Sequence, residues 1–249
     1  MFYDMIVHTN VSIGENSLDE VVDMAKKLGL DGICVPTYYT SLKDLKEYTS
    51  TLKKYDEIDV VSGVIVKADS PQDMNNIVSM VRKKVEMVIV HGGEYSINRA
   101  ACENPMVDIL AHPELNRTDS GLDHICAKSA ADNNVAIEIN FRELLESSGT
   151  LRVRTLKKIM KNVRICRNYK TPLITTSGAV SIWNMRSGRE LASVANLVGL
   201  PITEAIETVS TVPEKIVEDN RKKLNKEKIG DVEVIDDGQA KNTATDTEA

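Results

Sequence analysis

The residues best suited to chemistry in this chain are three histidines that end runs of apolar residues. His8, His91 and His112 each close such a run, and Glu138 and Asn140 lie on another. Imidazole and carboxylate groups that converge on one point are typical ligands of zinc and related ions. Strand-end histidines also occur as hydrogen-bonded groups in a polar pocket, so the spacing alone allows a metal site or a polar cluster.

A second kind of chemistry is electrostatic and lies between residues 152 and 170. This segment contains no acidic residue, and eight basic residues: Arg152, Arg154, Lys157, Lys158, Lys161, Arg164, Arg167 and Lys170. We expect the helically spaced apolar residues Val153, Leu156, Ile159, Met160 and Val163 to face the interior, which leaves the basic residues mostly outside. Such a row either binds phosphates, releasing counterions, or is an ordinary solvated face.

Single arginines and one tryptophan extend this basic character. The arginines that we expect in loops at the strand ends suit bidentate phosphate contacts; they are Arg99, Arg117, Arg142, Arg186 and Arg189. Trp183 either stacks on a nucleobase or packs within its loop. A basic group near the end (Arg221, Lys222, Lys223, Lys226 and Lys228) is interspersed with acids, which favours a mixed, solvated helix. Only 4% of residues are aromatic, so we expect recognition of nucleic-acid backbone and shape.

The elements that must position these groups alternate regularly along the chain. Buried strands are expected at Tyr3–His8, Gly32–Pro36, Val60–Lys67, Met87–His91, Val107–His112, Val135–Asn140 and Pro172–Thr176. Between and after them, helical patterns occur at Ser17–Leu28, Leu42–Tyr55, Gln72–Lys84, Ile97–Glu103, Leu122–Asn133, Arg152–Tyr169, Ser187–Val198, Ile202–Val209 and Pro213–Lys228. Ser17 with Glu20 forms the sequence of a capping box.

This alternation predicts an α/β fold with a parallel sheet and right-handed crossovers. A doubly wound open sheet is possible. A TIM-barrel-like (β/α) barrel of about seven parallel strands is favoured, because every strand is apolar throughout and no phosphate-binding glycine motif follows the first. We expect one domain over residues 1–230, with function at the carboxyl ends of the strands.

Composition sets limits on the class of protein. The chain has 249 residues and a net charge of −6, but residues 231–249 carry six of the acids and one base. The remainder is close to neutral, and the acidic tail is expected to be disordered. No apolar run is long enough for a membrane span, and the N-terminus does not resemble a signal peptide. Four unpaired cysteines, Cys34, Cys102, Cys126 and Cys166, indicate a cytoplasmic protein.

Several segments resemble the polymerase-and-histidinol-phosphatase family of metal-dependent phosphoesterases, with most of its ligands replaced. The resemblance implies that Ile6, Tyr38 and Ile65 stand where that family has metal ligands, and that Ser177-Gly178-Ala179-Val180 replaces its closing motif. His8 and the Ala111-His112-Pro113 segment are retained. The expectation is a barrel of this type with a degenerate metal site and no catalytic residue.

A closer resemblance covers about residues 1–210. The segments Asn98-Arg99-Ala100-Ala101, Asp108 to Leu115, Ala136 to Arg142, Thr175 to Ala179 and Met185 to Glu190 resemble the ribonuclease P protein component 3 family. The resemblance implies a non-catalytic subunit that supports the catalytic RNA in removing the 5′ leader of precursor tRNA. It implies as partners that RNA, protein component 2, the other protein subunits and, through the holoenzyme, precursor tRNA. Magnesium would be required by the RNA component, and no cofactor would bind this chain.

The residues expected to contact RNA are Arg99, Arg117, Arg142, Arg152, Arg154, Lys157, Lys158, Lys161, Arg164, Arg186 and Arg189. Two alternatives remain open. An active metal-dependent phosphoesterase would need His8 and His112 and would hold a tightly bound ion. A protein scaffold without RNA contact would tolerate charge reversal at Lys157, Lys158 and Lys161.

Overall fold

The apolar runs form parallel strands, as predicted. The computed structural model describes residues 1–52, 55–225, 228–229 and 232–233. Its parallel strands are β1 (Tyr3–Asp4), β2 (Gly32–Cys34), β3 (Thr37–Tyr38), β4 (Asp59–Val61), β5 (Gly63–Val66), β6 (Met87–His91), β7 (Ile109–Ala111), β8 (Ala136–Asn140) and β9 (Leu173–Thr176). Most residues of these strands are buried and apolar, because both faces of the sheet are covered.

Two of the predicted strands are each divided into two short pieces. The second, at Gly32–Pro36, becomes β2 followed by β3, and Pro36 between them has no N–H to donate to a neighbouring strand. The third, at Val60–Lys67, becomes β4 followed by β5. The interruption lies at Ser62, whose backbone N donates to Glu86 Oε2 at 2.7 Å. Counted in this way, the nine described parallel strands fall on the seven predicted positions.

The sheet closes into a ring. One part has the order β1-β2-β4 and the other the order β3-β5-β6-β7-β8-β9. A parallel bridge between Val7 and Ala179 joins the first position to the last, and His8 N donates to Ala179 O at 2.8 Å. The favoured closed barrel is therefore confirmed over the open sheet.

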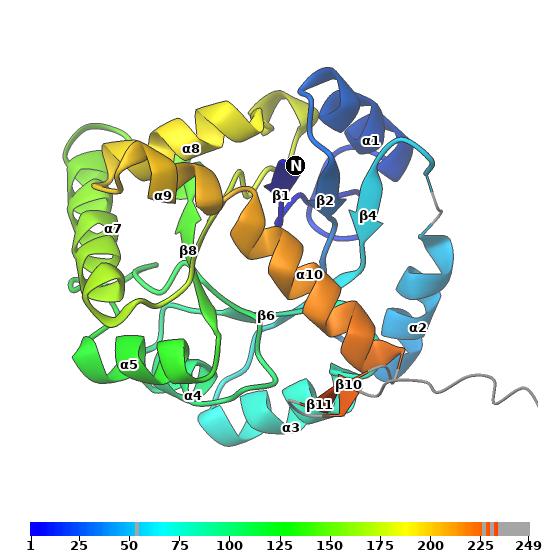
Figure 1. Ribbon diagram of the computed structural model, residues 1–249, viewed down its shortest axis with the longest axis horizontal. Helices are drawn as coiled ribbons and strands as arrows, with labels where there is room; N and C mark the ends of the chain where they lie inside the picture. Colours follow the sequence, from blue (N-terminus) through cyan, green and yellow to red (C-terminus); the bar gives the residue numbers. More distant parts are fainter. Residues whose placement is uncertain (53–54, 226–227, 230–231, 234–249) are drawn as a thin grey trace, which may run out of the picture.

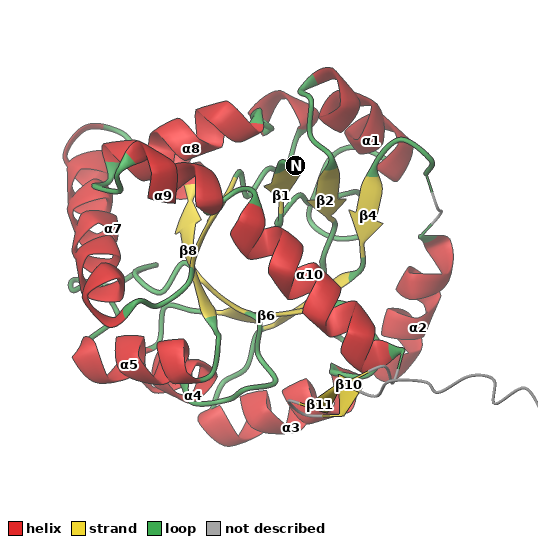
Figure 2. Ribbon diagram, in the orientation of Figure 1, coloured by secondary structure: helices red, strands yellow, loops and turns green. Residues whose placement is uncertain are grey.

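Helices surround this ring (Figure 2). They are α1 (Leu18–Lys27), α2 (Leu42–Thr51), α3 (Pro71–Val81), α4 (Tyr95–Cys102), α5 (His124–Asp132), α6 (Phe141–Glu146), α7 (Gly149–Tyr169), α8 (Gly188–Leu197), α9 (Ile202–Glu207) and α10 (Thr211–Leu224), with a 3-10 turn, η1, at Ile182–Asn184. The predicted capping box starts α1, since Ser17 N donates to Glu20 Oε2 at 2.8 Å and Glu20 N donates to Ser17 Oγ.

The last long helix closes one end of the barrel. α10 crosses the ring of strands (Figure 1), and Val217 on it joins the cluster of side chains inside the barrel. That cluster includes Met5, Ile65, Met87, Ile89 and Ile109, all nearly fully buried. Since α10 is ion-paired to residues at the amino ends of β4 and β6, the opposite end of the barrel, where the strands finish, remains for function.

The structure corrects several predicted boundaries. Helix α6 was not predicted, and α7 begins at Gly149 instead of Arg152. The last helix does not reach Lys228: α10 ends at Leu224, and β10 (Lys228–Ile229) pairs antiparallel with β11 (Val232–Glu233). Apart from these strand residues, the predicted acidic tail and its boundary at residue 230 lie outside the described residues.

The cysteines and the helices bear on two further predictions. All four cysteines are buried and unpaired, consistent with reduced, packed thiols. In the described part of the chain, no helix is long and apolar enough to cross a lipid bilayer.

Candidate nucleic-acid interface

The strand ends bring the predicted histidines together around Glu138. His91 Nδ1 and His112 Nε2 are hydrogen-bonded to each other at 2.9 Å, and the Tyr38 ring stacks parallel to the His8 ring with centroids 6.1 Å apart. Glu138 accepts hydrogen bonds from His112 N at 2.9 Å, from Asn140 Nδ2 at 2.9 Å and from the Thr176 hydroxyl. We call His8, His91, His112 and Glu138 the mouth cluster.

Burial and charge divide the mouth cluster into two kinds of group. Burial lowers the pKa of His8 and of His91 to about 4 each, so both rings are neutral near neutral pH. Burial also opposes charge on His112 and Glu138. Their mutual hydrogen bond and opposite charges outweigh it, raising the pKa of His112 and lowering that of Glu138. This end of the barrel therefore holds a coupled pair, His112 and Glu138, whose Nδ1 and Oε2 atoms lie 3.4 Å apart.

These residues do not fit a metal site. The facing nitrogens of His91 and His112 are used on each other, and both carboxylate oxygens of Glu138 accept protein hydrogen bonds. Ile6 and Ile65 are buried in the barrel interior. Within the described residues, no group of three or more His, Cys, Asp or Glu side chains could hold an ion. Three converging ligands are what such a site needs, so no reaction step is assigned to the mouth cluster.

The buried face of the long helix α7 agrees with the predicted one in part: Ile159 and Val163 are buried and Leu156 is partly buried. Thr155, Ile159, Asn162, Val163 and Cys166 face the barrel, a spacing of three and four residues. Val153 and Met160, which we expected inside, are 51% and 43% exposed. We predicted that Val153 and Met160 face inward because both side chains are apolar. The buried face instead includes the polar Asn162, which donates to Ser120 O at 2.8 Å.

Neighbouring groups engage some of the α7 cations. Arg152 Nε donates to Ser147 O at 2.7 Å, Lys158 Nζ donates to the carbonyl of Arg117, and Arg167 forms a bidentate pair with Glu204 at 2.8 and 3.0 Å. Each of these cations already has a protein acceptor, so each is a weaker candidate for phosphate contact.

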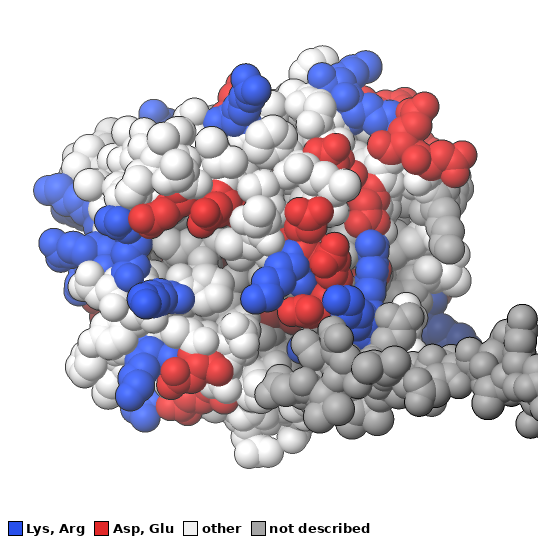
Figure 3. Space-filling model, in the orientation of Figure 1, with Lys and Arg blue, Asp and Glu red and all other residues white. Residues whose placement is uncertain are grey.

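Four other cations form no hydrogen bond or ion pair with any described residue. They are Arg154, Lys157, Lys161 and Arg164, all exposed, and we call them the α7 cationic row. Their spacing of three or four residues places neighbours about 5–6 Å apart on one helix face. Lysine and arginine side chains gather along the edge of the molecule that α7 forms (Figure 3).

The surface is hollowed on both sides of this row. One hollow of about 510 Å³ is lined by Arg117, Arg154, Lys157, Lys158 and Lys161, with Asp119 at its wall. A second, of about 420 Å³, is lined by Lys157, Lys161, Arg164 and Arg167 together with residues 198–199 after α8. Because Lys157 and Lys161 border both hollows, the row forms a cationic ridge between two depressions.

The predicted loop arginines are mostly engaged, and three of them lie on helices. Arg99 on α4 pairs with Glu103 at 2.9 Å, Arg142 on α6 pairs with Glu146 at 2.7 Å, and Arg189 lies on α8. The loop prediction was wrong for these three: Arg99 and Arg189 fall within the helices predicted at Ile97–Glu103 and Ser187–Val198, and Arg142 lies on α6, which follows β8 directly and was not predicted. Arg117, in a loop, forms a fork with Asp119 at 2.6 and 2.9 Å.

The remaining two positions lie beside the exposed tryptophan. Arg186 donates to the carbonyls of Trp183 and Met185 and lies over the Phe141 ring. Arg189 is exposed and forms no ion pair with a described residue. Among the five predicted arginines, Arg189 is thus the one whose guanidinium is not held by a described neighbour.

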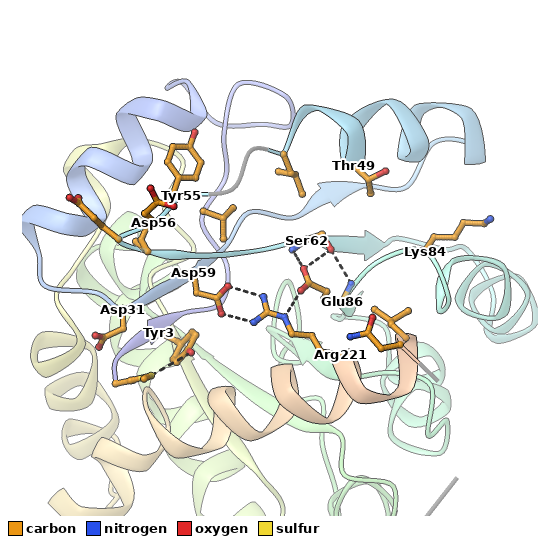
Figure 4. Close-up of a pocket in the computed structure, with 17 residues that line it drawn as sticks. Tyr3, Asp31, Thr49, Tyr55, Asp56, Asp59, Ser62, Lys84, Glu86 and Arg221 are labelled. Carbon is orange, nitrogen blue, oxygen red and sulfur yellow. Dashed lines mark hydrogen bonds and ion pairs between the residues drawn. The ribbon is translucent and has the colours of Figure 1, made fainter. Parts of the chain in front are cut away.

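The structure also reveals a large pocket that the sequence did not indicate. It has a volume of about 910 Å³ at the amino ends of the strands, and Arg221 of α10 projects into it (Figure 4). Arg221 pairs with Asp59 at 2.9 and 2.7 Å and with Glu86 at 2.6 Å. This favours the mixed-helix interpretation for Arg221. Asp59 and Glu86 lie more than 130 residues away along the chain, so no local pattern could have shown the pairing.

Comparison with solved structures places this geometry among known folds. The chain superposes on a chain of an archaeal ribonuclease P solved by cryo-EM with mature tRNA, with a TM-score of 0.77, 27% identity and coverage of 95% of this chain and 99% of that chain. It also resembles a histidinol phosphate phosphatase from Lactococcus lactis, with a TM-score of 0.51, 13% identity and coverage of 88% and 93%. The second likeness concerns the fold alone.

Comparison with curated sequences is more specific. The chain is 38% identical over 237 residues to ribonuclease P protein component 3 of Methanosarcina barkeri, covering 95% of this chain and 97% of that relative. It is 33% identical over 199 residues to the component 3 protein of Methanothermobacter thermautotrophicus, covering 79% and 81%. The family described as RNase P subunit p30 matches residues 1–225. The resemblance found in the sequence is confirmed, and the chain belongs to the RNase P subunit p30 family.

Proposed function

We propose that this chain supports the RNA of ribonuclease P by contacting RNA phosphates through the α7 cationic row. As a p30-family member it is a protein subunit of ribonuclease P, which matures tRNA 5′ ends. The observation that carries the proposal is that Arg154, Lys157, Lys161 and Arg164 have no acceptor among the described residues. Charges of one sign repel along a helix, and a polyanion offsets that repulsion.

The geometry of the row suits an RNA backbone better than a compact anion. From Arg154 to Arg164 the helix rises about 15 Å at 1.5 Å per residue, so the four side chains are spread over several phosphate groups. Long, flexible lysine and arginine side chains reach phosphates without a fixed geometry. Recognition of this kind depends on charge and shape and carries no base sequence.

The proposal assigns no catalytic residue and no cofactor to this chain. In the mouth cluster His112 and Glu138 are paired with each other, and the residues of the cluster do not fit a metal. In this proposal the phosphodiester chemistry on precursor tRNA belongs to the catalytic RNA and its magnesium. Ribonuclease P protein component 2 is the proposed direct protein partner, alongside the other protein subunits, and the complex is expected in the cytoplasm. These partners follow from family membership.

Reconstitution tests the role in cleavage directly. The catalytic RNA and component 2 are assayed for removal of the precursor-tRNA leader with and without this chain, at several magnesium concentrations. The expected result is that cleavage at low magnesium requires the full chain. Equal cleavage in both reactions at every magnesium concentration contradicts the proposal.

A salt titration tests the α7 cationic row. The double substitution Lys157→Gln and Lys161→Gln removes two proposed phosphate contacts. The slope of log binding constant against log salt for the catalytic RNA should therefore decrease in magnitude by roughly 1.4–1.8, at 0.7–0.9 for each contact. Binding is measured with the complete set of subunits.

Arg167→Gln is the matched control, because Arg167 lies on the same helix but is paired with Glu204. The slope measured for Arg167→Gln should stay close to that of the wild type, although this substitution also removes a positive charge from α7. Equal slopes for the double variant and the wild type would show that the α7 cationic row does not touch RNA, which is the outcome expected of a protein scaffold.

A further inference from the structure

We propose that Trp183 is a stacking platform for an unpaired nucleobase, a second RNA contact that rests on the proposed function but uses a different ligand group. Trp183 is the sole tryptophan of the chain and is 76% exposed. Burying an indole is strongly favourable in folding, so an indole held outside gains nothing for the fold. Loop packing, the alternative left open by the sequence, does not describe this side chain.

The backbone around Trp183 is anchored on both sides. Ile182 N donates to Asn16 Oδ1 at 3.1 Å, the Ile182 side chain packs against the cluster beneath α1, and Met185 is buried. Arg186 donates to the Trp183 carbonyl at 3.0 Å and to the Met185 carbonyl at 2.7 Å. An aromatic ring on an anchored turn loses little conformational freedom when a flat ligand stacks on it.

The charges near this turn favour a nucleic acid over an acidic or purely apolar partner. Along the chain from Ser177 to Arg189 there are two arginines, Arg186 and Arg189, and no acidic residue, although the exposed Glu15 lies beside this segment, since its backbone N donates to Val180 O at 2.7 Å. The next acid, Glu190, accepts hydrogen bonds from Ser187 N and Oγ at 2.9 and 2.8 Å and so is occupied by the cap of α8. A π face near an arginine that has no ion-pair partner among the described residues, here Arg189, is the combination that binds single-stranded RNA: stacking for the base and a cation for the phosphate.

The platform and the α7 cationic row lie on neighbouring elements. Trp183 lies in η1 and Arg189 in the first turn of α8, while Val198 and Gly199 beyond the other end of α8 line the hollow beside Lys161 and Arg164. The length of α8, ten residues, corresponds to about 15 Å. An RNA strand that contacts both the row and Trp183 would have to run along at least this length of the protein surface.

Because the chain has one tryptophan, its own fluorescence reports the contact. The full chain is titrated with a short fluorescently labelled oligoadenylate, and anisotropy of the label and emission of Trp183 are recorded together. Stacking should quench Trp183 in proportion to binding, and a duplex of equal length should bind without quenching because its bases are paired. Trp183→Ala should weaken oligoadenylate binding about 5- to 100-fold, and Trp183→Phe should retain most of it.

The outcomes separate this inference from the proposed function. Leu197→Ala, at an exposed apolar residue at the end of α8, is the control and should leave binding unchanged. Oligoadenylate binding without quenching overturns the platform and leaves the α7 cationic row standing. Absence of both signals overturns both. A change in Trp183 emission on adding component 2 alone, with no response to oligoadenylate, shows that the tryptophan binds protein and also overturns the platform.

Discussion

Asp4 places a carboxyl group in the fully buried first strand. Its Oδ1 accepts a hydrogen bond from Ser177 N at 3.0 Å, and its Oδ2 has no partner among the described residues. Burial raises the pKa of Asp4 to about 7, although hydrogen bonds from Ser177 act in the opposite direction. The folded protein therefore retains a proton here at a pH where an unfolded chain has released it.

This difference predicts how Asp4→Asn changes stability with pH. Between about pH 4 and 7 the folded state binds the extra proton, so the free energy of unfolding of the wild type falls as pH rises. Asparagine keeps an acceptor for Ser177 N and does not ionise. As pH rises across this range, the free energy of unfolding of the variant should therefore increase relative to that of the wild type, by on the order of 4 kcal/mol in total.

Urea unfolding of both proteins at several pH values measures the effect. The difference in free energy of unfolding should level off above about pH 8, where the carboxyl is ionised in both states. A difference that stays constant from pH 4 to pH 8 would show that Asp4 titrates normally in the folded protein.

At the scale of single elements, α10 acts as a strap across the amino ends of the strands. Arg221 joins Asp59, the first residue of β4, to Glu86 before β6, and Asn220 Nδ2 donates to Asp108 Oδ1 at 2.9 Å and to Glu86 O at 2.8 Å. Together these two residues connect one helix to three positions of the barrel. The pairing also explains why Arg221 contributes no free charge for RNA.

Arg221→Met should destabilise the protein by about 2 kcal/mol. The pair is partly exposed, so the loss lies between that of a surface pair and that of a buried one. Thermal or urea unfolding checks this. Lys223→Met on the same helix is the control, since Lys223 is exposed and has no ion pair with a described residue. Equal stability of the two variants would mean that the strap contributes no net energy.

At the scale of the whole molecule, closure of the ring depends on the turn after β9. Ala179 bridges to Val7, and Ser177 N donates to Asp4. Gly178 between them has a φ of +59°, and a Cβ there would come within 2.6 Å of Asn140 Oδ1. Glycine is needed at this position for conformation and for space.

Gly178→Ala should therefore cost about 2–4 kcal/mol, combining left-handed strain with crowding. Gly149→Ala separates these two effects, because Gly149 has a φ of +51° with open space around its Cβ position. It should cost only about 1 kcal/mol. Unfolding midpoints of both variants give the comparison, and equal losses would show that the space around Gly178 is not restrictive.

The barrel also shows how fold and function separate at this scale. The same architecture is found in a histidinol phosphate phosphatase. In this chain Ile6, Tyr38 and Ile65 leave that end of the barrel without converging ligands. A closed barrel of parallel strands is stable with or without a metal, because its interior is filled by side chains. The proposed RNA contacts therefore lie on the outer helices.

The sequence by itself determined the order of strands and helices, the closed barrel and the family. Alternating buried strands and amphipathic helices admit few arrangements, since crossovers are right-handed and both faces of the sheet must be covered. It also located the basic helix, because eight cations without an acid between residues 152 and 170 are visible in one dimension. Ile6 and Ile65, which stand where the resembling phosphoesterases have metal ligands, were recognised in the same way from short segments of the sequence.

Only the tertiary structure decided which charges are available. Arg167 and Lys161 look alike in the sequence, but Glu204 neutralises Arg167, and Lys161 has no ion-pair partner in the described part of the chain. The sequence likewise did not show that Asn162 is buried or that Val153 and Trp183 are exposed. The physical reason is that pairing and burial depend on neighbours brought from distant parts of the chain, whereas helical periodicity specifies only a face.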